Sequence, residues 1–189
     1  MDIARDTSSE PRGHAPRPRA LLATGRGWTA AGIGLVVFAS FVRFGFAAEA
    51  VVAAFFASVL VVLAAIDIEQ RIVPNRIVLP AAGLVLAAQL ALFPDRMPEF
   101  VLACVGAGLF LLLPLLIYPA GMGLGDVKLA MLLGAGLGTA VIGAFVVGFM
   151  AAFLVALGII FTRGLAGRKT AIPFAPFLAL GGLVALFFG

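Results

Sequence analysis

Long apolar runs, separated by short polar breaks or by breaks rich in glycine and proline, dominate the chain after residue 28. Most of these runs approach the roughly 20 residues that an α-helix needs to cross a bilayer. They predict helices at about residues 28–47, 50–66, 77–93, 100–118, 127–138, 140–162 and 174–188. The fifth is short for a full crossing. The pattern therefore predicts an all-α polytopic membrane bundle with about six or seven transmembrane helices.

The first 27 residues have a different composition. They are rich in Pro, Gly, Ser and Arg, and they contain no apolar run long enough for the core of a secretory signal. This composition predicts a disordered basic tail over residues 1–27, followed by a membrane domain over residues 28–189. The tail holds His14, the only histidine of the chain, and a single histidine in a mobile tail does not make a metal site.

Composition supports the membrane assignment and narrows the function. Of the 189 residues, 63% are hydrophobic and only 12% are charged, and the mean hydropathy is +1.18. The sequence pI is near 10.2, but the basic residues are scattered over the loops and do not form the basic, aromatic-interleaved face of a nucleic-acid-binding protein. Cys104 is the only cysteine and lies in an apolar run, which excludes a disulfide framework and a thiolate zinc site. We therefore expect a lipid bilayer, and no nucleic acid, as a partner.

The distribution of the basic residues over the loops predicts the topology of the chain in the membrane. If the tail is cytoplasmic, eleven of the thirteen Lys and Arg residues lie on the cytoplasmic side, and only Arg43 and Arg96 lie outside. Because positively charged loops remain inside, this distribution predicts a multi-pass protein of the cytoplasmic membrane with its N-terminus in the cytoplasm.

Two aspartates, Asp67 and Asp126, are placed where an apolar run meets a polar loop. Asp67 follows VLVVLAAI and opens DIEQRIVPN, and Asp126 lies in GMGLGDVK. A carboxylate at a membrane boundary is costly and usually has a functional reason. The segment between the two aspartates is long enough for two crossings, so both carboxylates can meet at the inner membrane surface. A membrane aspartyl protease would need such a pair.

The residues around each aspartate predict its local structure. Pro74 ends the preceding helix, and Asn75 is a favoured N-cap for the next one. Gly123 and Gly125 allow another segment, or an extended substrate, to approach the backbone closely. Asp126 is then expected to begin a helix, where the helix dipole favours its anionic form.

Three segments together resemble the type IV prepilin peptidases, the GxGD-type membrane aspartyl proteases that trim prepilins and pseudopilins: DIEQRIVPN, GMGLGDVKL and AIPFAPFLALGG. The resemblance extends over roughly residues 50–188 and implies that Asp67 and Asp126 are the catalytic pair. Residues matched to other motif positions are Gly123 and Gly125 of GxGD, the following Lys128, and Pro173, Phe174 and Pro176 of the late proline segment.

The resemblance also implies a substrate class and agrees with simple carboxyl chemistry. Two carboxylates in a partly dry site cannot both ionise cheaply, so one keeps its proton while the other activates a water; no metal or cofactor is required. The implied substrates carry a short basic leader in the cytoplasm and an apolar helix in the membrane. Glu69 either attracts that leader or pairs weakly with Arg71 at the surface. Lys128 either keeps Asp126 ionised or anchors its helix.

One departure from the family pattern concerns methylation. Many prepilin peptidases carry a cytoplasmic domain with paired CxxC motifs, which is linked to zinc and to methylation of the new N-terminus. Those cysteines are absent here. The chain thus resembles the compact, peptidase-only members, and we expect no N-methyltransferase activity.

Three other interpretations remain at this point. Signal-peptide-peptidase-like proteases pair GxGD with Tyr-Asp and Pro-Ala-Leu motifs, but here Ile66 precedes Asp67 and no Pro-Ala-Leu occurs. A proton-coupled transporter would place carboxylates near the bilayer midplane. A non-catalytic assembly protein that retains the fold is not excluded by the sequence.

Overall fold

The computed structural model describes residues 21–117, 123–163 and 173–189. Its elements are α1 (Leu21–Phe44), α2 (Ala48–Gln70), α3 (Asn75–Leu92), η1 (Pro94–Arg96), α4 (Met97–Ile117), α5 (Leu124–Leu137), η2 (Gly138–Ala140), α6 (Val141–Arg163) and α7 (Ala175–Phe188). Within these ranges there is no strand. The predicted all-α class is confirmed, and each predicted helix has a counterpart.

The two largest differences from the predicted helix boundaries are at the start of α1 and at the end of α2. Helix α1 begins at Leu21, so the last residues of the predicted tail are helical. Residues 1–20 lie outside the described ranges, and the division into a tail and a membrane domain otherwise stays a prediction. Helix α2 continues past residue 66 to Gln70, because a helix does not require an apolar side chain at every position and Glu and Gln are good helix formers.

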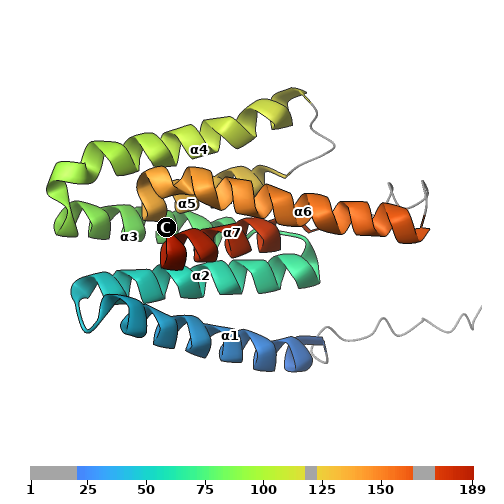
Figure 1. Ribbon diagram of the computed structural model, residues 1–189, viewed down its shortest axis with the longest axis horizontal. Helices are drawn as coiled ribbons and strands as arrows, with labels where there is room; N and C mark the ends of the chain where they lie inside the picture. Colours follow the sequence, from blue (N-terminus) through green and yellow to red (C-terminus); the bar gives the residue numbers. More distant parts are fainter. Residues whose placement is uncertain (1–20, 118–122, 164–172) are drawn as a thin grey trace, which may run out of the picture.

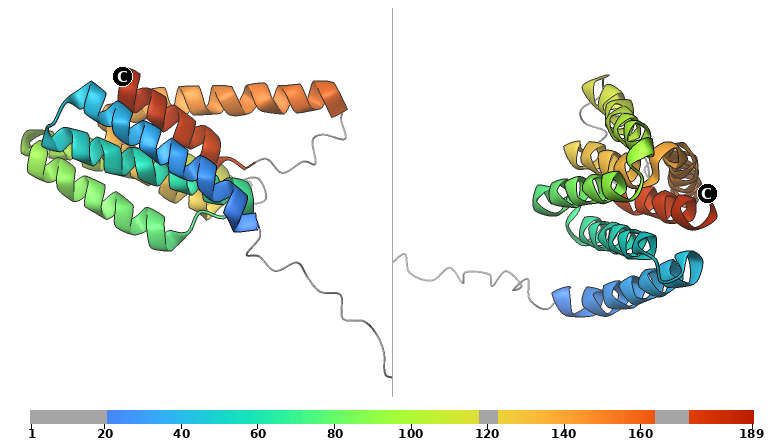
Figure 2. Two further views of the ribbon diagram at one scale, coloured as in Figure 1. Left: turned by 90° about the horizontal axis from the view of Figure 1, so that it is seen from below. Right: turned by 90° about the vertical axis from the view of Figure 1, so that its left-hand side faces the viewer.

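The helices form a bundle in which α5 occupies the centre (Figures 1 and 2). Helices α3, α4 and α7 pack against α5, while α2 packs against α1, α3 and α7. Helix α6 packs along α7, and its C-terminal half extends beyond the other helices (Figure 2). The C-terminal end of α2 and the N-terminal ends of α5 and α7 lie at the same end of the bundle (Figure 1).

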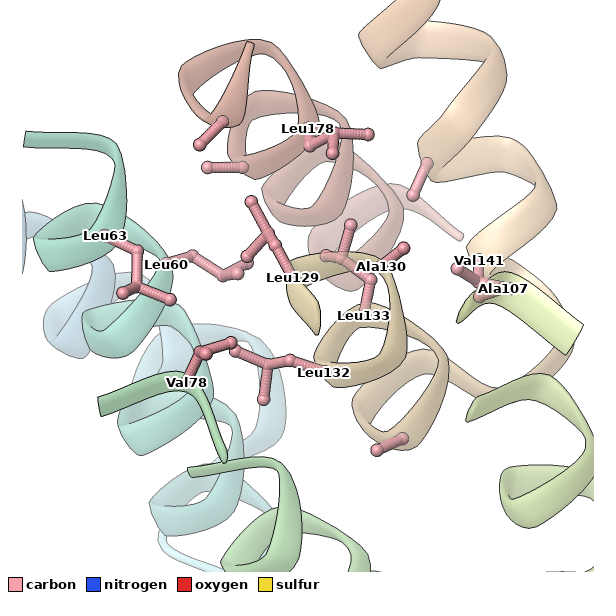
Figure 3. Packing of buried hydrophobic residues seen from close by; sticks show 14 of the residues in the cluster. Leu60, Leu63, Val78, Ala107, Leu129, Ala130, Leu132, Leu133, Val141 and Leu178 are labelled. Atoms are coloured by element: carbon pink, nitrogen blue, oxygen red, sulfur yellow. The ribbon is translucent and has the colours of Figure 1, made fainter. Parts of the chain in front are cut away.

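The core surrounds α5, whose side chains are apolar on nearly all sides. Leu129, Leu132 and Leu133 are fully buried between α2, α3 and α7 (Figure 3). Leu60 and Leu63 of α2 approach them from one side. A helix that is apolar all round is stable only when its neighbours cover it. The apolar character of α5 on nearly all sides therefore agrees with its place as the central helix of the bundle.

The outer surface is apolar as well. Among the described residues, five segments are long and apolar enough to cross a membrane, and α7 is a shorter apolar helix. Large side chains such as Phe38, Leu113 and Phe153 are at least 60% exposed. A soluble protein rarely exposes so much contiguous apolar surface, so the bundle is a multi-pass membrane protein.

Helices α4 and α5 approach each other closely at Gly134. A Cβ atom added there would contact the carbonyl oxygen of Ala103 and lie 2.7 Å from the Cα of Cys104. These are backbone atoms, which cannot move aside without moving α4. We therefore expect Gly134→Ala to lower the free energy of unfolding by about 1–3 kcal/mol, measured by thermal or denaturant unfolding in detergent.

Gly83 supplies the matched control for this prediction. It lies on the exposed face of α3, where an added Cβ would meet nothing within 4 Å. Gly83→Ala should leave stability unchanged or raise it slightly, because alanine has the higher helix propensity. Equal stability of the two variants would show that the helices do not pack closely at Gly134.

Candidate active site

Asp67 lies in the last turn of α2 and is buried, with only 6% of its surface exposed. Its Oδ2 atom accepts a hydrogen bond of 3.0 Å from the backbone N–H of Ala175, the first residue of α7. The N-terminus of a helix carries partial positive charge, so this contact favours an anionic Asp67. Arg71 ends α2 in the left-handed conformation, with φ of 54°, and its N–H bonds the Asp67 carbonyl at 2.8 Å.

Asp126 lies in the first turn of α5 and is also buried, with 9% of its surface exposed. The helix begins at Leu124, so Asp126 is its third residue, and the prediction that it begins the helix is wrong. Its Oδ2 atom accepts a hydrogen bond of 3.2 Å from the N–H of Gly123, the N-cap residue. The Asp126 N–H bonds the Gly123 carbonyl at 3.1 Å. These reciprocal bonds fix the side chain against the glycine turn.

Gly125 brings the two aspartate segments together. A Cβ atom on Gly125 would lie 2.7 Å from the Cβ of Val73, which belongs to the loop after α2. Only a glycine allows this loop to approach so closely. The segments that carry the two carboxyl groups are therefore in direct contact. At Gly123 an added Cβ would make only ordinary contacts, 3.8 Å from the Asp126 carboxylate, so this glycine is not needed for the close approach.

Lys128 connects the same two segments by a hydrogen bond. Its Nζ atom donates to Oδ1 of Asn75 at 2.7 Å. The N-cap of α3 is Pro74, and no side chain caps the helix, so the predicted capping by Asn75 is wrong. The Asn75 oxygen is instead the acceptor for Lys128. Among the described residues Lys128 forms no ion pair with a carboxylate, and its observed contact favours the anchoring role.

Loss of this hydrogen bond should weaken activity only moderately. A hydrogen bond to a charged group is worth about 1.5–3 kcal/mol when one partner is removed, and less when the group is near the surface. We therefore expect Lys128→Met and Asn75→Ala each to lower the rate of substrate turnover by about tenfold or less. Because both changes remove the same contact, the double variant should be no slower than the slower single variant. Multiplied losses would mean that the two residues act separately.

Glu69 and Pro173 are near the site but have no observed chemical role. Glu69 is exposed and forms no ion pair with any residue in the described ranges, Arg71 included. Pro173 is half-buried and lies just before α7. Within the part of the chain that the structure describes, no group of three or more His, Cys, Asp or Glu residues is arranged to hold a metal ion.

The amide of Ala175 is a site group that the sequence did not reveal. Pro176, in the first turn of α7, is typical of a helix start and so signals free N–H groups nearby. The signal does not say which carboxylate those groups would face. Only the packing of α7 against α2 brings the Ala175 N–H to Asp67, which lies 108 residues earlier in the chain.

The chain is similar to one family model and to several curated proteins. A model of the type IV leader peptidase family matches residues 54–162. A protein of Bacillus subtilis named prepilin leader peptidase/N-methyltransferase is 32% identical over 149 residues, which cover 78% of this chain and 60% of that protein. A protein of the same name from Xanthomonas campestris is 31% identical, over 80% of this chain and 54% of that protein. Another from Legionella pneumophila is also 31% identical, over 78% of this chain and 53% of that protein.

The chain therefore spans only about half to three fifths of the length of these curated relatives. No solved structure matches the chain at a significant level. The matched family segment includes both Asp67 and Asp126.

Proposed function

Because the chain belongs to the type IV leader peptidase family, we propose that it is a membrane endopeptidase that removes the short basic leader from type IV prepilins or pseudopilins. The observation that carries the proposal is the position of Asp67 and Asp126. They lie on different helices, are both buried, and belong to segments that pack together at one end of the bundle. A buried pair of carboxyl groups is the arrangement on which aspartyl proteolysis depends.

In the proposed mechanism the two carboxyl groups share one proton. The ionised group removes a proton from a bound water, whose oxygen attacks the carbonyl carbon of the scissile peptide. The protonated group donates its proton to the developing oxyanion. Collapse of the tetrahedral intermediate then breaks the C–N bond, as the amine leaves with a proton from the pair. The two Asp side chains are not assigned separately as acid and base, and no metal or cofactor takes part.

The hydrogen bonds at the site support this use of the carboxyl groups. In each aspartate, Oδ2 accepts a hydrogen bond from a backbone N–H. The donor is Ala175 for Asp67 and Gly123 for Asp126. Among the described residues, no hydrogen-bond donor contacts the Oδ1 atom of either aspartate. Neither Oδ1 atom is a fully buried oxygen that lacks a hydrogen-bond partner. Within the part of the chain that the structure describes, each carboxyl group therefore keeps one oxygen available for a water or a substrate.

We also propose that the site faces the cytoplasm, with the N-terminus on the same side. The support is the excess of basic residues in the segments at that end, which include Arg71, Arg76 and Lys128. Asp67 and Asp126 lie at helix ends, whereas a proton-coupled transporter would need carboxylates in the middle of its spans. A substrate with a cytoplasmic leader and an apolar membrane helix would present its junction at this depth.

Methylation is a separate question. The relatives are named for both a peptidase and an N-methyltransferase activity, and the chain spans only part of their length. The chain lacks the paired CxxC motifs, since Cys104 is its only cysteine. We therefore propose peptidase activity without methylation.

The proposal is tested by incubating the purified chain in lipid vesicles with purified precursors of several prepilin types and measuring intact masses. We expect loss of a fragment that ends between the basic leader and the apolar helix, with no methyl group on the new N-terminus even when the methyl donor S-adenosylmethionine is supplied. Vesicles without the chain are the control. Uncleaved precursors in every case would contradict the proposed function and favour a non-catalytic assembly role. Cleavage within the apolar helix would contradict the proposed cleavage site.

A further inference from the structure

A pocket of about 280 Å³ lies at the end of the bundle opposite Asp67 and Asp126. Its lining comes mainly from α2, α3, α5 and α7, and it includes Glu49 in the first turn of α2. Asp67 lies in the last turn of the same helix, about 27 Å farther along its axis (Figure 1). The hydrocarbon core of a bilayer is about 30 Å thick. The pocket is therefore at the level of the lipid head groups on the membrane surface opposite the candidate active site.

Gln89 of α3 gives this pocket a buried hydrogen-bond acceptor. The residue lines the pocket, and only 9% of its surface is exposed. Its Nε2 atom donates to the carbonyl oxygen of Gly136 at 3.0 Å, which fixes the orientation of the amide. Among the described residues no donor bonds its Oε1 atom, yet Oε1 is not a fully enclosed oxygen that lacks a partner. Oε1 is therefore open to the pocket and available to a ligand.

Two side chains of opposite charge complete the polar lining. Glu49 is exposed and forms no ion pair with any residue that the structure describes. Arg96 donates from Nε and Nη2 to the Glu99 carboxylate, at 3.0 and 3.1 Å. A guanidinium has more N–H groups than these two bonds use, so Arg96 keeps donors for another partner. The pocket thus offers a carboxylate, an amide oxygen and a cationic donor.

A ligand with a primary ammonium group and a phosphate group matches this set. The ammonium is cationic and carries N–H donors, which suits the Glu49 carboxylate and Oε1 of Gln89. The phosphate accepts charge-assisted hydrogen bonds from a guanidinium such as that of Arg96. The two groups occur together in the head group of an ethanolamine phospholipid. Leu92 and Phe93, which are half-buried, also line the pocket and offer apolar contacts to the acyl chains.

We propose that this pocket binds the head group of an ethanolamine phospholipid, with the ammonium at Glu49 and Gln89 and the phosphate at Arg96. The bound lipid connects the start of α2 with the end of α3 and with η1. Choline and glycerol head groups fit less well, because choline has no N–H donor and glycerol has no positive charge. The inference uses neither Asp67 nor Asp126, so it does not rest on the proposed peptidase function.

Lipid selectivity tests this proposal. The purified chain in mild detergent is titrated with phosphatidylethanolamine, phosphatidylcholine or phosphatidylglycerol carrying identical acyl chains, and bound lipid is measured by native mass spectrometry. We expect phosphatidylethanolamine to bind at least about fivefold more tightly than the other two, since only its ammonium donates hydrogen bonds to charged and polar acceptors. Equal affinities for the three lipids, or tighter binding of phosphatidylglycerol, would overturn the proposal.

Three variants locate the bound head group. Glu49→Gln removes a charge from an exposed side chain, and Gln89→Met removes the amide oxygen. Each should weaken phosphatidylethanolamine binding about threefold to tenfold. Asp95→Asn is the matched control and should bind as the wild type does, because Asp95 is an exposed carboxylate in η1 that is not among the lining residues. Unchanged binding by Glu49→Gln, which does not disturb the Gln89–Gly136 bond, would overturn the proposal even if Gln89→Met is unstable.

Glycerophosphoethanolamine, which has the same head group without acyl chains, distinguishes a lipid from a soluble ligand. We expect it to bind at least about tenfold more weakly than the lipid, because it buries no acyl chain against the apolar lining. Equal affinity would overturn the lipid assignment and make the pocket a site for a soluble phosphoethanolamine compound.

Discussion

Replacement of Asp67 or Asp126 by asparagine is expected to lower the rate of leader removal by at least about 10³-fold, while the bundle stays folded. Asparagine has nearly the same shape as aspartate, and its amide oxygen can still accept the N–H of Ala175 or Gly123. It can neither accept nor donate the proton on which general acid–base catalysis depends, and that contribution is typically 10²–10⁴-fold. Initial rates of prepilin cleavage and thermal unfolding of each variant measure the two effects separately.

Asp95 provides the control for these variants. It is exposed in η1, at the end of the bundle far from both aspartates. Asp95→Asn should therefore cleave at the wild-type rate. In the proposed mechanism Asp67 and Asp126 act as one unit, so the double variant should be about as slow as either single variant. Near-normal cleavage by Asp67→Asn or Asp126→Asn would remove that residue from the mechanism.

Gly125→Ala is expected to have the second-largest effect, a loss of activity of about tenfold to 100-fold. The new Cβ would lie 2.7 Å from the Cβ of Val73, and a Cβ is too close to the backbone to rotate away. The loop after α2 must then move from the first turn of α5, which separates Asp67 from Asp126. Overpacking of this kind typically costs 1–3 kcal/mol. Cleavage rates of wild type and variant, measured at equal folded fraction, check this result.

Two further variants show whether the contact with Val73 is the cause. Val73→Gly removes the opposing Cβ, so the double variant should cleave faster than Gly125→Ala alone. Gly123→Ala should cleave at close to the wild-type rate, because its Cβ would be 3.8 Å from its nearest neighbours and its φ of −92° suits any residue. An equal loss in Gly123→Ala and Gly125→Ala would indicate that turn flexibility, and not the close approach, matters.

The end of the bundle at which the aspartates meet could be predicted from the sequence. Helix number and direction follow from the boundaries of apolar runs, and these boundaries were nearly correct. The sequence therefore places Asp67 and Asp126 on the same side. The predicted ends of individual helices are less accurate: α2 continues beyond Asp67 to Gln70, and α5 begins at Leu124.

Contacts between distant segments could not be predicted, because no local pattern encodes them. The amide of Ala175 reaches Asp67 across 108 residues, and Lys128 reaches Asn75 across 53. Asn75 shows the physical reason for one error. Its side chain has the chemistry of an N-cap, but the Lys128 ammonium is a stronger partner for its oxygen than a backbone N–H. The GxGD glycines also look equivalent in sequence, yet only Gly125 faces another segment closely.

The most direct test of the central claim, that Asp67 and Asp126 form one site, measures whether these two positions can be bridged. A chain with Cys104→Ala, Asp67→Cys and Asp126→Cys would be treated in membranes with a short reagent that joins two thiols, and its fragments analysed by mass. We expect a bridge between positions 67 and 126, and none when Asp95→Cys replaces Asp67→Cys. If both thiols react with a monofunctional reagent but no bridge forms between 67 and 126, the two carboxylates do not share a site.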